Sequence, residues 1–526
     1  MGEQILHGVS AAPGVVAGRV VVLGTVTDNR LVERTQRPAE MERARSALAK
    51  EIASLEDMAR RLRDMGRPAD AEIVETGVLM ARDPGLLDRV ENLVLGSGRS
   101  APSALTAAAE EVASVLASLD DPTLAERAAD VRSLGRRAAA TAAGVELVPG
   151  GILIATDLGP ADVADLGLGA SGAALAQGGV TAHAAIVARS LGIPMVVGLG
   201  PQVLDVVSGE AVVLDADQGL VVRRPTPSRQ VAAEAHAVQR REAREAARRT
   251  RDEPALTADG HRVTVFVNVA TMAEAIEGFE QGAEGIGLLR TELPFLDASD
   301  WPSTRRQVEF LEPIFARLVG RPATVRLFDF GADKTPPFLR GTPARGIGLL
   351  LESRDALRCQ LTAILEAARG ADVRILVPMV TTAEQLRSIR QALPAPARLG
   401  AMIETPEAAR AAGAIAAESD FFSIGTNDLT QLVLGLDRER SRTAPVLDPR
   451  VLRLIDATVR AAHDAGILVD VCGEAASDPQ AMPVLVGLGV DELSVAAARV
   501  GLVRAAVREL DYSECRRKAA GLLDQA

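Results

Sequence analysis

Apolar residues recur with a helical period through the first part of the chain, from about Pro38 to Ala143. In AEMERARSALAKEIASLEDMARRL (residues 39–62) they fall at positions i, i+3, i+4 and i+7, with no alternating runs. Proline or glycine interrupts the pattern at four places, because neither residue continues a helix well: residues 66–68, 83–84, 96–102 and 120–122. The pattern predicts a bundle of about four helices.

Short β-rich runs flank this helical region. One run precedes it, VVAGRVVVL, and four follow it, GILIATDL, MVVGLG, AVVLDA and LVVRRP, with a helix expected near residues 182–191. A helical bundle inserted into a compact β/α domain explains this order. The predicted β/α domain therefore comprises residues 1–25 and 144–225, and the inserted helical domain comprises residues 26–143.

Residues 226–253 favour a helix but are polar nearly all round, which is typical of a helix that bridges two domains. From residue 254 to 526, apolar strand candidates alternate with helical stretches. The strand candidates are VTVFVNV, GIGLLR, TVRLFDF, RILVPMV, RLGAMIE, FFSIGTND, LVDVCGE and ELSV. This alternation predicts a TIM (β/α)8 barrel. The fold class is thus α/β multidomain.

A TIM barrel builds its active site at the carboxyl ends of its strands, so polar residues are expected there. Such residues do end the strand candidates: Asn268, Arg290, Asp329, Glu404, Asn427 with Asp428, and Cys472 with Glu474. Their position indicates one shared site at the barrel mouth.

The composition is that of a folded protein, with 48% hydrophobic and 24% charged residues among 526. A net charge of −12 argues against nucleic acid or an anionic membrane as partner and suits a basic protein partner. The three cysteines favour neither a disulfide framework nor a cysteine-rich metal site. With no export signal and no long apolar stretch, we expect a cytoplasmic protein without membrane insertion.

The segment GGVTAHAAIVARSLGIPMVVG, residues 178–198, is typical of a glycine turn followed by a short helix. We expect Thr181 to cap the helix and Gly192 with Pro194 to end it. His183 then lies in the first turn, where free backbone N–H groups favour an anion such as a phosphorylated imidazole. Neutral histidine is a competent nucleophile. A structural histidine at a helix start remains the alternative.

Glu404 and Asp428 end neighbouring strand candidates, so their carboxylates are expected at one mouth, where few hard oxygen ligands suit Mg²⁺. Arg290, Arg326 and Arg438 lie at or just beyond strand ends, and guanidinium groups bind phosphate and carboxylate in a bidentate manner. The combination predicts a small, highly anionic phosphorylated substrate. Any one of these arginines could instead be a solvated surface charge.

Cys472 is either a small buried hydrophobe or a thiol that donates a proton to a carbanion-like product. Lys334 follows the third strand candidate in DFGADK and is weakly indicated as a phosphate ligand.

Taken together, these motifs resemble enzyme I of the bacterial phosphoenolpyruvate-dependent sugar phosphotransferase system over essentially the whole chain. The first half carries GVSAAPGVVAGRV, AEIVETGVLMARDP, DPTLAERAADVRSLGRR and the histidine segment. The barrel carries GIGLLRTE, FDFGADKTP, MIETPEAA, FFSIGTNDLTQ, LDRER and VCGEAASDP. The histidine segment and FFSIGTNDLTQ are highly specific, whereas MIETP alone would be weak.

The resemblance implies a phosphoenolpyruvate-protein phosphotransferase. His183 would be the phosphorylated residue, Glu404 and Asp428 would hold Mg²⁺, and Cys472 would protonate enolpyruvate. The substrate-binding residues would be Arg290, Arg326, Arg345, Asn427, Asp428 and Arg438. The helical domain would bind the histidine-containing phosphocarrier protein, and the barrel would mediate a homodimer.

The chain departs from the family pattern at four positions: Ala182 for a serine, Gly348 for an arginine, Gly159 for a hydroxyl residue and Ala332 for a glycine. The stretch before Arg345 is also a few residues short. None of these changes removes the nucleophile or a metal ligand, so we expect activity. The alternatives are a regulatory relative that has lost turnover, and a relative of pyruvate phosphate dikinase or phosphoenolpyruvate synthase that lacks the ATP domain.

Overall fold

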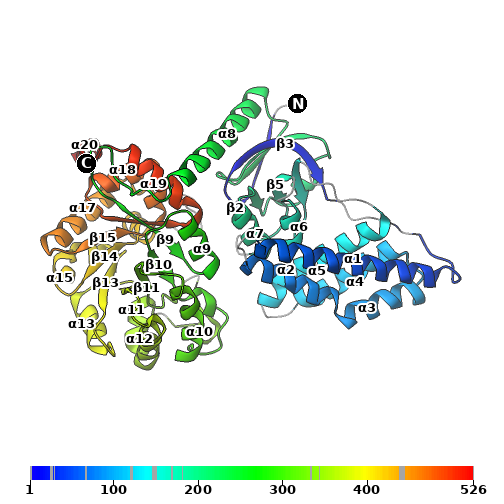
Figure 1. Ribbon diagram of the computed structural model, residues 1–526, viewed down its shortest axis with the longest axis horizontal. Coiled ribbons are helices and arrows are strands. Elements are labelled where there is room, and N and C mark those ends of the chain that lie inside the picture. The colour runs from blue at the N-terminus through cyan, green and yellow to red at the C-terminus, as the bar shows by residue number, and fades with distance from the viewer. Residues whose placement is uncertain are drawn as a thin grey trace. The chain divides into compact units, whose positions relative to one another are not determined.

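The structure is a computed structural model. It describes residues 3–23, 28, 30–64, 68–118, 122–144, 151–166, 170–179, 182–331, 334–342, 344–436 and 445–524. The chain forms two compact units, residues 1–241 and residues 242–526 (Figure 1). Each unit is described by itself.

The first unit contains a mixed sheet with the strand order β1-β8-β7-β3-β4-β5-β6-β2. Strands β3 to β6 pair in parallel, whereas β1, β2, β7 and β8 join antiparallel. The strands are Gln4–His7, Val9–Ala12, Val15–Val22, Gly151–Ala155, Ala170–Leu175, Met195–Val197, Ala211–Asp215 and Leu220–Arg223. Strand β5, ASGAAL, was not predicted, because its alanine, glycine and serine residues lack the β-branched signal of a strand.

Between β3 and β4 the chain forms the predicted helical bundle (Figure 1). Its α-helices are α1 Arg37–Asp64, α2 Pro68–Ala81, α3 Pro84–Glu91, α4 Ala101–Ala117 and α5 Pro122–Ala143. The predicted breaks at residues 83–84 and 96–102 are correct, whereas residues 66–67 and 120–121 lie outside the described residues. Proline occupies the first turn of α2 to α5, where its missing N–H costs nothing. Leu48, Leu105 and Leu134 lie in the bundle core.

The described part of this unit also contains the α-helices α6 Pro160–Leu166 and α7 His183–Leu191. The predicted bridging helix is α8, Pro227–Arg249.

The second unit contains a closed barrel of parallel strands in the order β9 to β16. The strands are Thr264–Val269, Ile286–Arg290, Ala323–Arg326, Val373–Val377, Arg398–Ile403, Phe421–Ile424, Leu468–Val471 and Glu492–Ala496. The helices are α9 Met272–Glu280, α10 Thr304–Phe315, α11 Gly346–Glu352, α12 Arg354–Ala368, α13 Ala383–Ala392, α14 Pro406–Arg410, α15 Ala412–Ala416, α16 Thr426–Leu434, α17 Pro449–Asp464, α18 Ala481–Gly487, α19 Val500–Glu509 and α20 Tyr512–Asp524. The predicted fold class is confirmed, while the exact domain boundaries stay a prediction.

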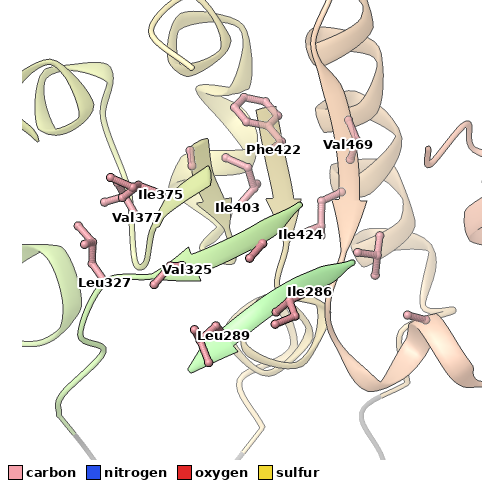
Figure 2. Close-up of a cluster of buried hydrophobic side chains, with 14 of the residues drawn as sticks. Ile286, Leu289, Val325, Leu327, Ile375, Val377, Ile403, Phe422, Ile424 and Val469 are labelled. Carbon is pink, nitrogen blue, oxygen red and sulfur yellow. The ribbon is translucent and has the colours of Figure 1, made fainter. Parts of the chain in front are cut away.

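Successive residues of a barrel strand point to opposite faces of the sheet. One set of side chains therefore packs against the surrounding helices, and the other set packs inside the barrel. Outward residues such as Ile375 and Val377 join the large cluster between strands and helices (Figure 2). Leu376, which lies between them, joins Met402 and Cys472 in a small separate cluster. The barrel interior at the level of Cys472 is therefore packed with side chains.

A second set of buried interior residues is polar. Arg374 on β12 donates to both carboxylate oxygens of Glu492 on β16, at 3.1 and 2.8 Å. The Ser423 hydroxyl donates to Asp470 Oδ2 at 2.7 Å. Burial raises the pKa of the Asp470 carboxyl well above its ordinary value, the negative charge of Glu492 raises it further, and Ser423 and Arg374 act in the opposite direction. Asp470 therefore keeps its proton at a higher pH than an ordinary aspartate.

We predict that Asp470 makes the barrel less stable as pH rises. An acid with a raised pKa in the folded state binds more protons there than in the unfolded chain, so stability falls from its unfolded pKa of 3.8 upward. The slope for one group is at most about 1.4 kcal/mol per pH unit. Urea unfolding from about pH 5 to pH 8 should show Asp470→Asn gaining stability relative to the native chain. A constant difference between the two proteins would contradict the prediction.

Candidate active site

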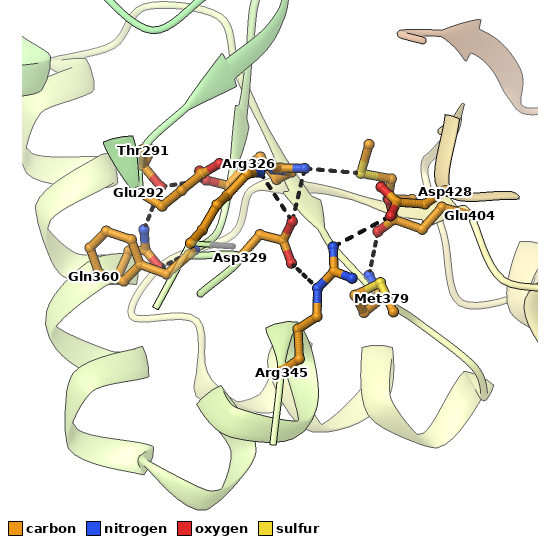
Figure 3. Close-up of polar contacts among 12 residues, drawn as sticks. Thr291, Glu292, Arg326, Asp329, Arg345, Gln360, Met379, Glu404 and Asp428 are labelled. Atoms are coloured by element: carbon orange, nitrogen blue, oxygen red, sulfur yellow. Dashed lines mark hydrogen bonds and ion pairs between the residues drawn. The ribbon is translucent and has the colours of Figure 1, made fainter. Parts of the chain in front are cut away.

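Arg326, the last residue of β11, lies buried at the mouth of the barrel. Its guanidinium pairs with Glu292 Oε1 at 2.5 Å and with Asp329 Oδ2 at 3.3 Å (Figure 3). Lys334 Nζ lies 3.0 Å from the same Glu292 oxygen and 3.7 Å from Asp329 Oδ2. Buried charges are stable only when groups of opposite charge pair with them. The two cations and the two carboxylates of this cluster therefore stabilise one another.

The pKa values of this cluster show which groups carry charge. Burial raises the pKa of the Glu292 carboxyl, but Arg326 and Lys334 outweigh burial and bring it to about 2. Burial lowers the pKa of the Arg326 guanidinium, because it disfavours the charged form. The negative charges of Glu292 and Asp329 outweigh burial and raise this pKa above its ordinary value. Glu292 and Arg326 are therefore both ionised at neutral pH.

Arg345 connects this cluster to the opposite side of the mouth. Its Nε lies 3.5 Å from Asp329 Oδ1, and its Nη2 lies 3.5 Å from Asp428 Oδ1 (Figure 3). Arg345 is the N-cap residue of α11, and Asp428 lies in the first turn of α16. The structure thus brings together the predicted residues Arg326, Arg345, Asp428 and, beside them, Glu404.

Glu404 follows β13 directly and is fully buried. Its Oε1 accepts a hydrogen bond from the Met379 backbone N–H at 2.7 Å, while Oε2 has no hydrogen-bond partner among the described residues. Burial and the neighbouring Asp329 raise the pKa of this carboxyl to about 8. A buried carboxylate oxygen without a donor is costly, and a divalent cation held by Glu404 and Asp428 would satisfy it. The residues present therefore fit a hard cation such as Mg²⁺.

The remaining predicted residues are placed as follows. Arg290 ends β10, in register with Arg326 on β11, so both arginines end their strands at the same level. Asn427 Oδ1 accepts a hydrogen bond from the Glu474 N–H at 3.1 Å. Cys472 directly follows β15 and is buried. Arg438 and Ala332 lie outside the described residues.

Sequence reasoning did not assign a role to Glu292 or Asp329. Both are fully buried beside Arg326, and both follow a strand end, in LLRTE and RLFDF. Their position after a strand end was the signal that could have placed them at the barrel mouth. The sequence does not show which arginine each carboxylate pairs with, because the closed barrel determines these contacts. These carboxylates hold the guanidinium groups of Arg326 and Arg345 in place.

His183 is the first residue of α7, as predicted, but the N-cap is Ala182 without a side-chain cap, rather than Thr181. Thr181 lies outside the described residues, and Gly192 ends the helix in the left-handed conformation, as predicted. His183 Nδ1 is buried and lies 3.4 Å from Asp130 Oδ2 of α5. Asp130 also pairs with Arg127 at 3.2 Å. His183 Nδ1 has no hydrogen-bond partner among the described residues, so the imidazole faces a carboxylate of the helical bundle without donating to it.

Ion pairs attach α5 to the loop that follows β4 and to α6. Arg136 binds Asp157 at 2.7 Å and Asp162 at 3.4 Å, and all three side chains are largely buried. Gly159 lies in the same loop, and a Cβ there would lie 2.6 Å from Ser133 Cβ. Close packing against Ser133 therefore leaves no room for a side chain at Gly159.

We predict that Gly159→Ala lowers the free energy of unfolding by about 1–3 kcal/mol, because the new methyl group overpacks the contact with Ser133. Adding Ser133→Gly should recover most of the loss. Thermal unfolding of both variants measures this coupling. Equal destabilisation in the single and the double variant would contradict it.

None of the helices in the described part of the chain is long and apolar enough to cross a membrane.

The barrel and its mouth define a phosphate-handling or carboxylate-handling α/β enzyme, and comparison with known proteins specifies which family. Residues 244–512 match the PEP-binding domain of PEP-utilising enzymes. Residues 7–127 match the N-terminal domain of these enzymes, and residues 147–219 match their mobile domain. The chain belongs to the family of phosphoenolpyruvate-utilising enzymes.

Proteins of two names are among those similar to this chain. The phosphoenolpyruvate-protein phosphotransferase of Priestia megaterium is 32% identical over 97% of this chain and 94% of its own length. The multiphosphoryl transfer protein of Rhodobacter capsulatus is 40% identical over 85% of this chain, and that of Xanthomonas campestris pv. campestris is 36% identical over 96%. The matches span only 57% and 64% of the length of these two relatives.

Proposed function

We propose that this protein is a Mg²⁺-dependent phosphoenolpyruvate-protein phosphotransferase, which transfers a phosphoryl group from phosphoenolpyruvate to His183 and then to a histidine-containing phosphocarrier protein. One observation carries the proposal. Two guanidinium groups, Arg326 and Arg345, lie at one barrel mouth beside Glu404 and Asp428, and Glu404 Oε2 is buried without a hydrogen-bond partner in the described residues. This arrangement suits a cation and a small polyanion together.

The barrel residues bind the substrate and neutralise its charge. Arg326, Arg345 and Arg290 would contact the phosphate and carboxylate of phosphoenolpyruvate, with Asn427 and Arg438 as further contacts. Glu404 and Asp428 would hold Mg²⁺, which when bound withdraws electron density from the phosphoryl oxygens. Phosphoryl transfer depends mainly on positioning and charge neutralisation, so these residues supply what the reaction needs.

His183 would be the nucleophile. With Nδ1 turned toward Asp130, the other ring nitrogen, Nε2, is the one that attacks phosphorus. The N–H groups of the first turn of α7 would stabilise the phosphoimidazole. Since His183 and the barrel mouth belong to different units, the histidine must be delivered to the substrate, and this motion can limit turnover.

Loss of the phosphoryl group leaves the enolate of pyruvate, which needs a proton at carbon. The buried Cys472 thiol, directly after β15, would donate this proton.

The partners follow from the same proposal. The helical domain, residues 26–143, would bind the carrier protein, and the barrel, residues 254–526, would mediate a homodimer. Residues 1–25 with 144–225 would carry the histidine, residues 226–253 would link the parts, and the protein would act in the cytoplasm.

The proposal is tested by incubating the purified protein with labelled phosphoenolpyruvate, Mg²⁺ and a purified carrier protein, and measuring pyruvate and labelled carrier. We expect equal amounts of both. A regulatory relative without turnover would release no pyruvate. A relative of the dikinases would need ATP or inorganic phosphate, so transfer without either excludes that alternative.

A further inference from the structure

Helix α12, which lies outside the strands of the barrel, carries a buried glutamine that is hydrogen-bonded to two segments of the mouth. Gln360 is fully buried, and its Oε1 accepts a hydrogen bond from the Phe328 N–H at 2.9 Å. Its Nε2 donates to the Thr291 hydroxyl at 3.0 Å (Figure 3). Burial of an amide is costly unless its polar atoms are hydrogen-bonded, so these two contacts hold the Gln360 side chain in one orientation.

Thr291 continues this chain of hydrogen bonds to the strand that carries Arg326. The Thr291 side chain is buried, and its hydroxyl donates to the Arg326 backbone carbonyl at 2.8 Å. A backbone N–H can only donate, and a backbone carbonyl can only accept. The two backbone ends therefore fix the donor and acceptor roles of the glutamine and the threonine between them. Both ends lie within residues 326–328, so the chain ties the end of β11 to the segment that follows β10.

The residues that directly follow these contacts are the two carboxylates that pair with the Arg326 guanidinium. Glu292 follows Thr291, and Asp329 follows Phe328. Arg326 Nη2 lies 2.5 Å from Glu292 Oε1, and Arg326 Nη1 lies 3.3 Å from Asp329 Oδ2. One buried amide thus holds the backbone next to both carboxylates, and the threonine holds the backbone of the arginine itself.

Hydrogen bonds and ion pairs constrain a guanidinium group in different ways. Coulomb attraction depends on distance, whereas a hydrogen bond also weakens steeply as its angle bends. Ion pairs alone would let the Arg326 guanidinium turn whenever Glu292 or Asp329 moved. The chain of hydrogen bonds opposes such movement, because it fixes the backbone to which both carboxylates are attached. A phosphate or carboxylate of a substrate then meets forked donors in a fixed direction.

We propose that Gln360 and Thr291 are positioning residues for phosphoenolpyruvate, which act by holding the carboxylates that orient Arg326. The inference rests on the proposed function, in which Arg326 contacts the substrate. Neither side chain binds the substrate itself. The Thr291 hydroxyl is engaged with Gln360 and the Arg326 carbonyl, and Gln360 lies on a helix outside the barrel.

The test is calorimetric titration of phosphoenolpyruvate into the Mg²⁺-loaded full chain that carries His183→Ala, so that the substrate binds without transfer. Thr291→Val keeps the size of the side chain and removes the hydroxyl. We expect its dissociation constant to rise about 10- to 100-fold, because a misdirected guanidinium loses about one charge-assisted hydrogen bond to the substrate. Thr291→Ser restores the hydroxyl and should bind almost as tightly as the parent. Parent-like affinity of the valine variant, or equal weakness of both variants, would overturn the inference.

A second variant tests the chain as a unit. Gln360→Met keeps the length of the side chain and removes both of its hydrogen bonds, so it should weaken binding as much as Thr291→Val. The double variant should lose no more than either single variant, because both residues belong to one chain of bonds. Losses that multiply in the double variant would contradict the chain.

Thr458→Val is the matched control. It removes the hydroxyl of another fully buried threonine, on α17, which donates to the Leu454 carbonyl at 2.7 Å. This variant should bind phosphoenolpyruvate with the affinity of the parent. An equal loss in Thr458→Val would assign the effect to general damage to the barrel and overturn the positioning role.

The parent protein separates this inference from the proposed function. If the parent does not bind phosphoenolpyruvate in the presence of Mg²⁺, the proposed function is wrong. If the parent binds it and the variants of Thr291 and Gln360 bind it equally well, only the positioning role is wrong.

Discussion

Replacement of His183 by alanine is expected to abolish the transfer of label from phosphoenolpyruvate to the carrier protein, with a loss of about 10⁴-fold or more. The imidazole is the nucleophile in this account, and alanine carries no nucleophilic group. Transfer is measured with labelled phosphoenolpyruvate, Mg²⁺ and excess carrier.

The matched control is His236→Ala, which removes an exposed histidine on α8. It should transfer label at the native rate. Retained transfer by the His183 variant would show that another residue accepts the phosphoryl group.

Glu404→Gln is expected to weaken Mg²⁺ binding strongly and to remove most of the phosphotransferase activity. Removal of a residue that only hydrogen-bonds to a metal ligand typically lowers the affinity for the metal about 10- to 100-fold. Removal of a charged ligand should therefore lower the Mg²⁺ affinity at least as much. Glutamine keeps the size of the side chain and accepts the Met379 hydrogen bond, so the fold is retained. Calorimetric titration with Mg²⁺ and pyruvate release are the two measurements.

Glu407→Gln is the control, because Glu407 is exposed on α14 only three residues away. It should bind Mg²⁺ normally. Unchanged Mg²⁺ affinity in the Glu404 variant would remove this residue from the metal site.

The sequence predicted the barrel because short apolar strand candidates alternate with helical stretches, and most of these strand candidates end in a polar residue. Glu404, which directly follows β13, and Asp428, in the first turn of α16, were predicted at one mouth, and the structure has Arg326 beside them. The reason is physical, since the carboxyl ends of parallel strands in a closed barrel meet at one rim.

Contacts between distant segments were not predictable in the same way. Asp130 lies 53 positions before His183 in a polar helix face, and only the folded first unit brings the two side chains to 3.4 Å. Asp470 looks like an isolated polar residue in an apolar strand, and its link to Ser423 depends on the register of β14 and β15. Strand β5 was missed because small residues carry no strand signal.

The central claim is that phosphoenolpyruvate phosphorylates His183. The most direct measurement is intact mass spectrometry of the native protein after a brief reaction with phosphoenolpyruvate and Mg²⁺, with peptide mapping at alkaline pH to preserve phosphohistidine. The account predicts one acid-labile phosphoryl group per chain, located on the peptide that contains His183, together with an equal amount of pyruvate. A stable phosphoryl group on another residue, or pyruvate without any modified protein, would contradict it.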